Sequence, residues 1–318
     1  MRVRFGYVAI ALNIADGSPN KTVTATSLAK IADQKGRINR LRRLTQENLA
    51  TTLRILRYNA AHGIHFYRFT SKTVPLATHP LTANTWNYLA DFASEWQEIG
   101  DYIKSHGMRV SAHPDHYTLL NSPKTEVLAA SVKDLDYHVN MLEAMGLPTA
   151  PQLVIHVGGV YKNKESSLDR FVSQFNSLSD RIRLRLMLEN DDKVYTAAEV
   201  LALCQEISVP MVLDVHHHYC ANNGETVADL WPDIVRTWHG AIPKIHISSP
   251  KNMKEFRSHA DFVEVADVLP FLTMAGKFGQ DVDVMIEAKN KDQALFKLLD
   301  ELEKIPGINR IEQAVIEI

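Results

Sequence analysis

Short runs of β-branched and other apolar residues alternate along the chain with longer stretches whose apolar positions repeat every three or four residues. The short runs are typical of buried strands, and the longer stretches predict helices with one apolar face. Eight strands are predicted: Val3–Ile10, His65–Thr70, Arg109–His113, Gln152–Val157, Arg185–Glu189, Met211–Val215, Lys244–Ser248 and Val282–Ala288.

Helical spacing is clearest between the first and fourth predicted strands. Apolar stripes run over residues 49–60, 89–103 and 128–142, and each is followed by a glycine typical of a helix end, at Gly63, Gly107 and Gly146. Ser122 before Pro123 predicts the start of the third of these helices. Weaker stripes follow the fourth to seventh strands, and a last helix is predicted over Ala294–Ile305.

Eight strand–helix units in 318 residues predict a single α/β domain over residues 1–318, a (β/α)8 TIM barrel. A doubly wound open sheet is the alternative, but the sequence has neither a G-x-G-x-x-G loop after the first strand nor a P-loop. Residues 14–44 are predicted to form an insertion in the first βα loop, rich in Lys, Arg, Ser and Thr. On a barrel, such a loop lies at the C-terminal ends of the strands, where active sites are found.

The composition, with 45% hydrophobic and 23% charged residues, is that of an ordinary globular protein. A formal net charge of −2 excludes a globally basic protein that holds DNA by bulk charge, although it leaves room for a local basic face. Two cysteines, Cys204 and Cys220, are too few for a disulfide framework, so a reducing cytoplasm is the expected location. We expect no membrane partner, because no apolar run is long enough to cross a bilayer and the N-terminus lacks a secretory pattern.

Potential metal ligands stand at the C-terminal ends of six successive predicted strands, the third to the eighth. Imidazoles and carboxylates crowded at one rim are costly unless they bind cations, and this mixture suits Zn²⁺, Mn²⁺ or Fe²⁺. Because the ligands exceed the needs of one ion, two or three ions are predicted, with Glu189 and Asp214 as bridges. The residues concerned are His113, His156, Glu189, Asp214, His217, His246 and Glu287, with His79 and His259 in neighbouring loops.

Sites with several metal ions typically hydrolyse phosphate esters, because the ions activate water and stabilise the leaving oxygen. A metal-dependent sugar isomerase on the same barrel is a second interpretation of these ligands. A third is a binding protein that needs metal and carries out no reaction, and a rim so rich in titratable groups argues against it. The ligand pattern alone leaves both enzyme interpretations open.

In these residues the sequence resembles the UV damage endonuclease family, whose fold is related to those of endonuclease IV and xylose isomerase. The resemblance implies a DNA repair enzyme that nicks the phosphodiester 5′ to UV photoproducts in double-stranded DNA, without ATP and with no obligatory protein partner. An abasic-site endonuclease similar to endonuclease IV is the alternative. Matching segments run nearly from end to end: Phe5–Tyr7, Tyr67–Arg68, Pro75–Pro80, His113–Pro114, Ile155–Gly159, Leu188–Asp192, Asp214–His217, Pro243–Pro250, Ser258–Asp261 and Met285–Lys289.

The resemblance also implies three divalent ions, with manganese as the expected metal and zinc, cobalt or magnesium as alternatives. The lysine that matches Lys244 is carboxylated in relatives and is then a metal ligand, and an unmodified lysine is the alternative. Lys244 and His246 are two residues apart on one strand, so both face the same side. We expect Glu189, Lys244 and Glu287 to carry catalysis. The implied ligand sets are His113, His156 and Glu189 for the first ion, Glu189, Asp214, His246 and Glu287 for the second, and His217 and His259 for the third.

Members of the family flip a damaged dinucleotide out of the duplex and fill the gap with a glutamine followed by a tyrosine or phenylalanine. The matching pair is His116-Tyr117, which keeps the aromatic ring but has histidine in place of glutamine, so the lesion preference stays open. Tyr7 and Asn13 match positions of the lesion pocket, with core packing as the alternative for Tyr7. His79 matches a site histidine that contacts phosphate or holds its loop.

Basic residues are candidates for contacts with DNA phosphates. Arg68, at the end of the second strand, and Lys72 are two of them. Phosphate contacts would make DNA binding depend on salt even at this net charge. A further positive run lies in the insertion, where a solvated helix face is the alternative; it comprises Lys30, Lys35, Arg37, Arg40, Arg42 and Arg43.

Overall fold

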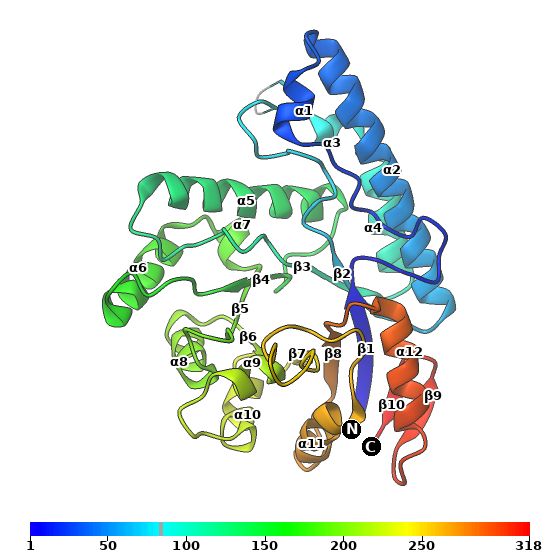
Figure 1. Ribbon diagram of the computed structural model, residues 1–318, viewed down its shortest axis with the longest axis vertical. Coiled ribbons are helices and arrows are strands. Elements are labelled where there is room, and N and C mark those ends of the chain that lie inside the picture. The colour runs from blue at the N-terminus through cyan, green and yellow to red at the C-terminus, as the bar shows by residue number, and fades with distance from the viewer. Residues whose placement is uncertain (83–84) are drawn as a thin grey trace.

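The computed structural model describes residues 1–82 and 85–318 and confirms the predicted TIM barrel. Eight parallel strands follow one another around a closed sheet, because β1 pairs with β8 on one side and with β2 on the other. Figure 1 shows the helices packed around the outside of these strands. The barrel strands are β1 (Arg2–Val8), β2 (Phe66–Phe69), β3 (Arg109–Ala112), β4 (Leu153–His156), β5 (Leu186–Glu189), β6 (Met211–Asp214), β7 (Lys244–Ile247) and β8 (Val282–Ile286).

Most connections between the strands contain the helix that the apolar stripes predict. The longer helices are α2 (Gln34–Ala61), α4 (Ala93–Ser105), α5 (Thr125–Ala144), α6 (Lys164–Ser177), α8 (Ala197–Ile207), α10 (Val227–Arg236), α11 (Val265–Gly276) and α12 (Lys291–Leu302). Shorter ones are α1 (Ala25–Ala29), α3 (Tyr88–Asp91), α7 (Asp180–Arg183) and α9 (Val215–Cys220). None of the helices in the described ranges is both long and apolar enough to span a membrane.

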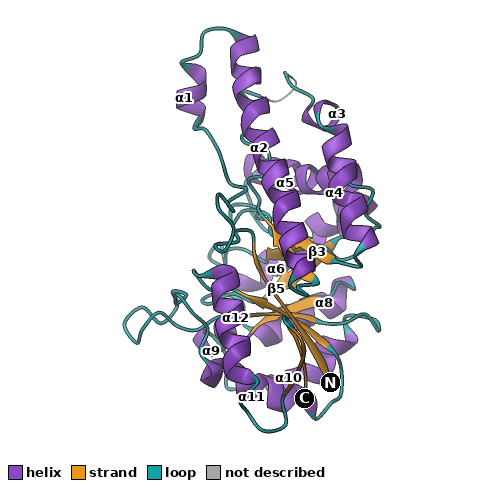
Figure 2. Cartoon of the chain, turned by 90° about the vertical axis from the view of Figure 1, so that its right-hand side faces the viewer, coloured by secondary structure: helices purple, strands orange, loops and turns teal. Residues whose placement is uncertain are grey.

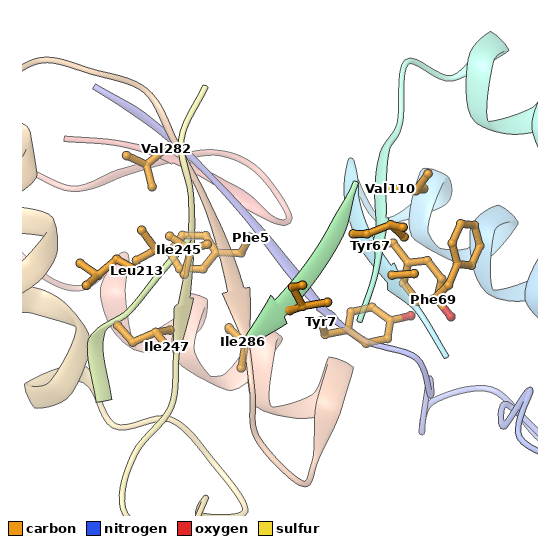
Figure 3. Packing of buried hydrophobic residues seen from close by; sticks show 14 of the residues in the cluster. Phe5, Tyr7, Tyr67, Phe69, Val110, Leu213, Ile245, Ile247, Val282 and Ile286 are labelled. Atoms are coloured by element: carbon orange, nitrogen blue, oxygen red, sulfur yellow. The ribbon is translucent and has the colours of Figure 1, made fainter. Parts of the chain in front are cut away.

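Outward-facing strand residues build the main core of the molecule. Phe5, Ile245 and Ile286 come from neighbouring strands, are fully buried, and belong to one large apolar cluster that also includes residues of the surrounding helices (Figure 3). Burying a side chain of this size contributes roughly 1.5–3 kcal/mol. This layer between the strands and the helices therefore provides most of the hydrophobic stabilisation of the fold. The interior of the barrel provides much less.

Inward-facing residues alternate with these and form a smaller cluster inside the barrel. Val154, Met187 and Val212, from three successive strands, pack together with Trp238. Side chains two residues apart on a strand face the same side. The residues two positions further along these three strands therefore also face inward, at the C-terminal rim, and they are His156, Glu189 and Asp214.

A buried ion-pair group lies inside the barrel near the N-terminal ends of the strands. Asp283 is fully buried, and its carboxylate accepts hydrogen bonds from Nε of Arg4 at 2.6 Å and from Nη1 of Arg109 at 2.5 Å. Burying a carboxylate requires such partners. The interior thus contains fixed charges at both ends, with the small apolar cluster between them.

A C-terminal hairpin, which the sequence analysis does not predict, lies beside β1. It consists of β9 (Asn309–Glu312) and β10 (Val315–Glu317), and β10 runs antiparallel to β1. β10 pairs with the first half of β1, whereas β2 pairs with the second half. β9 is mostly polar and β10 has only three residues, so neither strand shows an alternating apolar pattern in the sequence.

Residues 14–44 are not a loop throughout, because α2 begins at Gln34. Asp33 caps this helix, since its side chain accepts a hydrogen bond from the backbone N–H of Gly36 at 2.7 Å. In the first turns of α2 the apolar residues Ile38, Leu41 and Leu44 lie among many basic and polar ones, so their stripe is weak in the sequence. Most of the basic run therefore lies on a helix, and Arg42 pairs there with Asp91 at 2.7 Å. Figure 2 shows α1 and the first turns of α2 projecting away from the strands.

Two more helix boundaries differ from the prediction. The stripe over 89–103 is divided into α3 and α4 at Phe92, whose buried ring belongs to the core and whose backbone leaves the helical region with φ −121° and ψ 29°. α5 begins at Thr125 rather than at Ser122. The hydroxyl of Ser122 accepts a hydrogen bond from the N–H of Lys124 at 3.2 Å, so this serine closes a turn before the helix.

Candidate metal centre

Glu189 lies at the centre of the rim, at the end of β5, and is only 2% exposed. Its carboxylate faces imidazoles from three other strand ends. Oε1 lies 2.8 Å from Nδ1 of His246, and Oε2 lies 3.2 Å from Nε2 of His113 and 3.8 Å from Nε2 of His156. A carboxylate is buried at an acceptable cost only when it is paired or binds a cation. The surrounding imidazoles meet that requirement and could share a cation with it.

Three groups of potential metal ligands share this one carboxylate. Within each group the ligand atoms lie within 4.8 Å of one another. Glu189 therefore lies where a carboxylate that bridges several ions would have to lie. The groups are His113, His156 and Glu189; Glu189, Asp214 and His217; and Glu189, His246 and Glu287.

His217 and His259 approach the centre from different sides. Nδ1 of His217 lies 3.6 Å from Oδ2 of Asp214 and 3.7 Å from Oε1 of Glu189. Nδ1 of His259 lies 3.8 Å from Oε2 of Glu287, and the two imidazole rings are 6.2 Å apart. Among the residues that the structure describes, His259 joins none of the three groups. It faces the cluster from the side of Glu287.

Two buried ligand atoms have no hydrogen-bond partner within the described part of the chain, Oδ2 of Asp214 and Nε2 of His246. Both residues are fully buried. Buried polar atoms without partners are costly and rare in native proteins. A divalent cation among these residues would give the carboxylate oxygen a partner, and mixed imidazole and carboxylate donors suit ions such as Mn²⁺ or Zn²⁺. The residues thus fit a metal centre.

Backbone and side-chain hydrogen bonds hold the ligands of β5 and β6 together. The side chain of Asn190 donates to the carbonyl of Asp214 and accepts from its N–H, each at 2.9 Å. Oδ1 of Asp214 accepts from the N–H of His217 at 2.8 Å and so caps α9. Nδ1 of His217 lies 2.9 Å from the carbonyl oxygen of Asn190, which positions the ring. Sequence reasoning did not single out Asn190, although it lies next to Glu189 within the matching segment Leu188–Asp192.

The electrostatic balance of the centre favours ionised carboxylates and a protonated His217. Burial would raise the pKa of Glu189, but the imidazoles of His246 and His156 hold it well below its ordinary value. Burial opposes a charge on His217 as well, yet Asp214 and Glu189 raise its pKa to about 9. A cation bound through this imidazole must displace its proton, so metal binding strengthens as the pH rises toward that value.

Lys244 lies on the inner face of β7, two residues before His246. It is 1% exposed, and its Nζ has no hydrogen-bond partner among the described residues. Burial and the guanidinium groups of Arg109 and Arg68 hold the pKa of Lys244 well below its ordinary value. This environment favours the neutral amine, which is the nucleophilic form of a lysine.

Arg68, a candidate phosphate contact in the sequence, is 8% exposed and lies inside the centre. Its guanidinium forms an ion pair with Glu287. Burial would raise the pKa of Glu287, but Arg68 and His246 lower it below its ordinary value. The charge of Arg68 is thus used within the protein, where it orients a potential metal ligand.

Tyr7 lies in the core, in agreement with the alternative interpretation, core packing. Its buried position does not support a direct contact with a lesion. It is 0% exposed, its hydroxyl donates to Oδ1 of Asn59 at 2.7 Å, and its ring centroid lies 5.8 Å from that of Tyr67 (Figure 3). Asn13 is exposed in the loop after β1, where its side-chain amide donates to the hydroxyl of Tyr58 at 3.1 Å.

Two neighbouring cavities lie at the rim. The first, of about 390 Å³, contains Glu189 and His116 in its wall, and the second, of about 490 Å³, is lined by Tyr117 and His79. Tyr117 is 46% exposed, and Nδ1 of His79 accepts a hydrogen bond from the N–H of Leu81 at 3.1 Å, within its own loop. His116 and His79 join no ligand group in the described ranges. The walls of both cavities share Ser71, Lys72 and Asp115.

Asp292 holds the loop after β1, and sequence reasoning missed it. It is fully buried in α12, and its carboxylate accepts hydrogen bonds from the N–H groups of Leu12 and Asn13, at 2.6 and 3.1 Å, and from the hydroxyl of Tyr58 at 3.1 Å. An acidic residue near a helix start is normally a cap. Its distant partners leave no signal in the local sequence.

Comparison with known proteins gives a consistent family. A model of the UV-endonuclease UvdE family matches residues 3–318. A UV DNA damage endonuclease of Bacillus cereus (strain B4264) is 44% identical over 319 residues, which cover 100% of both chains. One from Bacillus anthracis (strain A0248) is 42% identical with the same coverage.

Solved structures agree with this result. The crystal structure of SacUVDE is 31% identical, has a TM-score of 0.85, and matches over 95% of this chain and 98% of that one. Endonuclease IV from Thermus thermophilus is 13% identical with a TM-score of 0.58, covering 95% of this chain and 100% of the other. The second likeness shows a common fold and nothing beyond the fold.

Replacement of Glu189 by glutamine should remove most of the bound metal. Glu189→Gln keeps the shape of the side chain but removes the negative charge that all three ligand groups share. We expect the manganese content per chain, measured by elemental analysis after equilibrium dialysis, to fall by more than half. Glu312→Gln, an exposed glutamate on β9, is the matched control and should leave the content unchanged. Full manganese content in Glu189→Gln would show that Glu189 is not a shared ligand.

Proposed function

This chain belongs to the UV-endonuclease UvdE family and is a DNA repair endonuclease, and on this basis we propose that it nicks double-stranded DNA 5′ to UV photoproducts and so starts excision repair. The observation that carries the proposal is the set of three ligand groups that share Glu189 in the wall of a rim cavity. Divalent ions held there would activate water and stabilise the leaving oxygen. The expected products are a 3′-hydroxyl and a 5′-phosphate.

The chain's own residues would hold two or three ions, with manganese as the proposed metal. Glu189 and Asp214 contribute buried negative charge, which is available because neighbouring imidazoles favour the ionised form of Glu189. Glu287 is oriented by Arg68, and His259 faces Glu287 from the loop after β7. The remaining ligands are His113, His156, His217 and His246, each within 4 Å of a carboxylate oxygen.

We further propose that Lys244 is carboxylated. Its neutral amine would attack the carbon of CO₂, forming an N–C bond and releasing one proton, which leaves a carbamate with one negative charge. That charge would be balanced by the guanidinium groups of Arg109 and Arg68, which disfavour an ammonium at the same place. The carbamate oxygens would add a ligand on the inner face of β7, beside His246.

His116 and Tyr117 are proposed to fill the gap that an extruded lesion leaves in the duplex. They line the two adjoining cavities, and the ring of Tyr117 is exposed for stacking. Histidine at position 116 can donate and accept hydrogen bonds, as glutamine does. His79 lines the second cavity, and Asn13 lies in the loop after β1, whose residue Ile10 lines the first. Both are proposed to contact the DNA backbone or the lesion.

An incision assay on three duplexes tests this function. Each duplex has the same sequence and carries either one UV photoproduct, one abasic site or no lesion, and is incubated with the manganese-loaded protein. We expect a single nick immediately 5′ to the photoproduct and no cutting of the undamaged duplex. Preferred cutting of the abasic duplex would favour the endonuclease IV-like alternative. Conversion of free sugars without any nick would favour the isomerase.

Removal of the Tyr117 ring should weaken lesion recognition and leave the metals in place. Stacking of an aromatic ring on a base contributes about 1–3 kcal/mol, so Tyr117→Ala should weaken binding of the photoproduct duplex by roughly ten- to a hundredfold. A substrate that is already unpaired opposite the lesion needs less opening of the duplex, so Tyr117→Ala should lose less affinity for it. The measurement is binding of both substrates together with manganese content.

Phe278 provides a matched control for this variant. It is an aromatic residue of similar exposure, at 50%, that lies after α11 and lines neither rim cavity. Phe278→Ala should bind both substrates as the unmodified protein does. Equal losses on both substrates, or loss of manganese from Tyr117→Ala, would mean that Tyr117 is not the residue that fills the gap.

A further inference from the structure

Lys291 lines the metal cavity but is not one of the potential metal ligands. It is the first residue of α12 and reaches the cavity wall that also contains Glu287 and Arg68. Burial and the positive charge of Arg68 lower the pKa of this half-buried amine, and the negative charge of Glu287 opposes that shift and favours the ammonium. Within the described ranges its Nζ forms no ion pair and no hydrogen bond. Arg68, by contrast, is neutralised by Glu287.

The backbone holds Lys291 firmly at this place. Its φ of 46° lies in the left-handed region, which residues with a side chain seldom adopt. The next residue, Asp292, is fully buried and accepts hydrogen bonds from the N–H groups of Leu12 and Asn13. An unfavourable backbone conformation that is fixed by its surroundings is often found at functional sites. The side chain of Lys291 is therefore held in the wall of the cavity, where a negatively charged ligand can reach it.

We propose that Lys291 binds a non-bridging oxygen of a DNA phosphate at the metal cavity. The inference rests on the proposed function, because it takes DNA as the substrate. A lysine ammonium is a compact charge with three donors, which suits a phosphate oxygen. In TIM barrels, the loops after strands 7 and 8 frequently bind phosphate groups, and Lys291 directly follows the loop after β8. Lys72, from the loop after β2, also lines this cavity.

The test compares Lys291→Met, which keeps the aliphatic length and removes the charge, with the unmodified metal-loaded protein. Binding of a photoproduct duplex is recorded by fluorescence anisotropy before appreciable cutting, at a series of salt concentrations. Each phosphate contact contributes about −0.9 to the slope of log K against log salt, so this slope should become shallower by about that amount. Affinity at moderate salt should fall by roughly tenfold. Lys297→Met, further along α12 and paired with Glu301, is the matched control and should keep the slope.

Duplexes with one methylphosphonate in place of a single phosphate identify the contact. At the linkage that Lys291 binds, the neutral methylphosphonate should weaken binding of the duplex by the unmodified protein. Lys291→Met should bind this substituted duplex as weakly as it binds the unsubstituted one. Unchanged salt slope together with additive losses at every linkage would overturn the proposal, as would loss of manganese from Lys291→Met. If the unmodified protein binds the duplexes but does not nick them, the proposed function fails, and the anisotropy data still decide the role of Lys291.

Discussion

The withdrawal of the Glu189 carboxylate from water is the constraint on which the rest of the site depends. At 2% exposure, this carboxylate has lost its hydration, and positive charge or hydrogen bonds must compensate for that loss. Imidazoles from the ends of β3, β4 and β7 provide part of this compensation and keep it ionised. The same geometry gathers three ligand groups around one residue. Under the proposed function, such a centre would hold several cations at one place, as phosphodiester hydrolysis by several ions requires.

The closed barrel tolerates this concentration of buried charge without a large loss of stability. Its main apolar core lies outside the strands, so the inner face can carry charges without removing the principal source of stability. The buried Asp283 group near the N-terminal ends places Arg109 inside the barrel, and Arg109 in turn disfavours an ammonium at Lys244. Burial and this guanidinium group therefore favour the neutral amine at the lysine beside the metal ligands. Asp292 similarly connects α12 to the loop after β1, and Lys291 and Ile10, from these two segments, line the cavity.

Much of this arrangement could be predicted, because strand ends of a TIM barrel meet at one rim. Glu189 and His246 could be placed together from the eight-strand pattern alone, and the family resemblance of the sequence is confirmed. Tyr7 could not be placed, since a tyrosine on a strand fits the core and the site equally well, and the structure buries it. The pairing of Arg68 with Glu287 joins residues 219 positions apart. Local spacing carries no information about such a contact, and the same holds for Asp292.

Electron paramagnetic resonance of the manganese-loaded protein tests most directly whether one buried carboxylate gathers several ions. Ions that share the Glu189 carboxylate lie close enough for their electron spins to couple. We predict a spectrum dominated by coupled manganese ions, together with two to three manganese ions per chain in the protein that nicks photoproduct duplexes. One isolated, uncoupled manganese ion per chain in a fully active preparation would contradict a shared ligand at Glu189 and with it the central role of this residue.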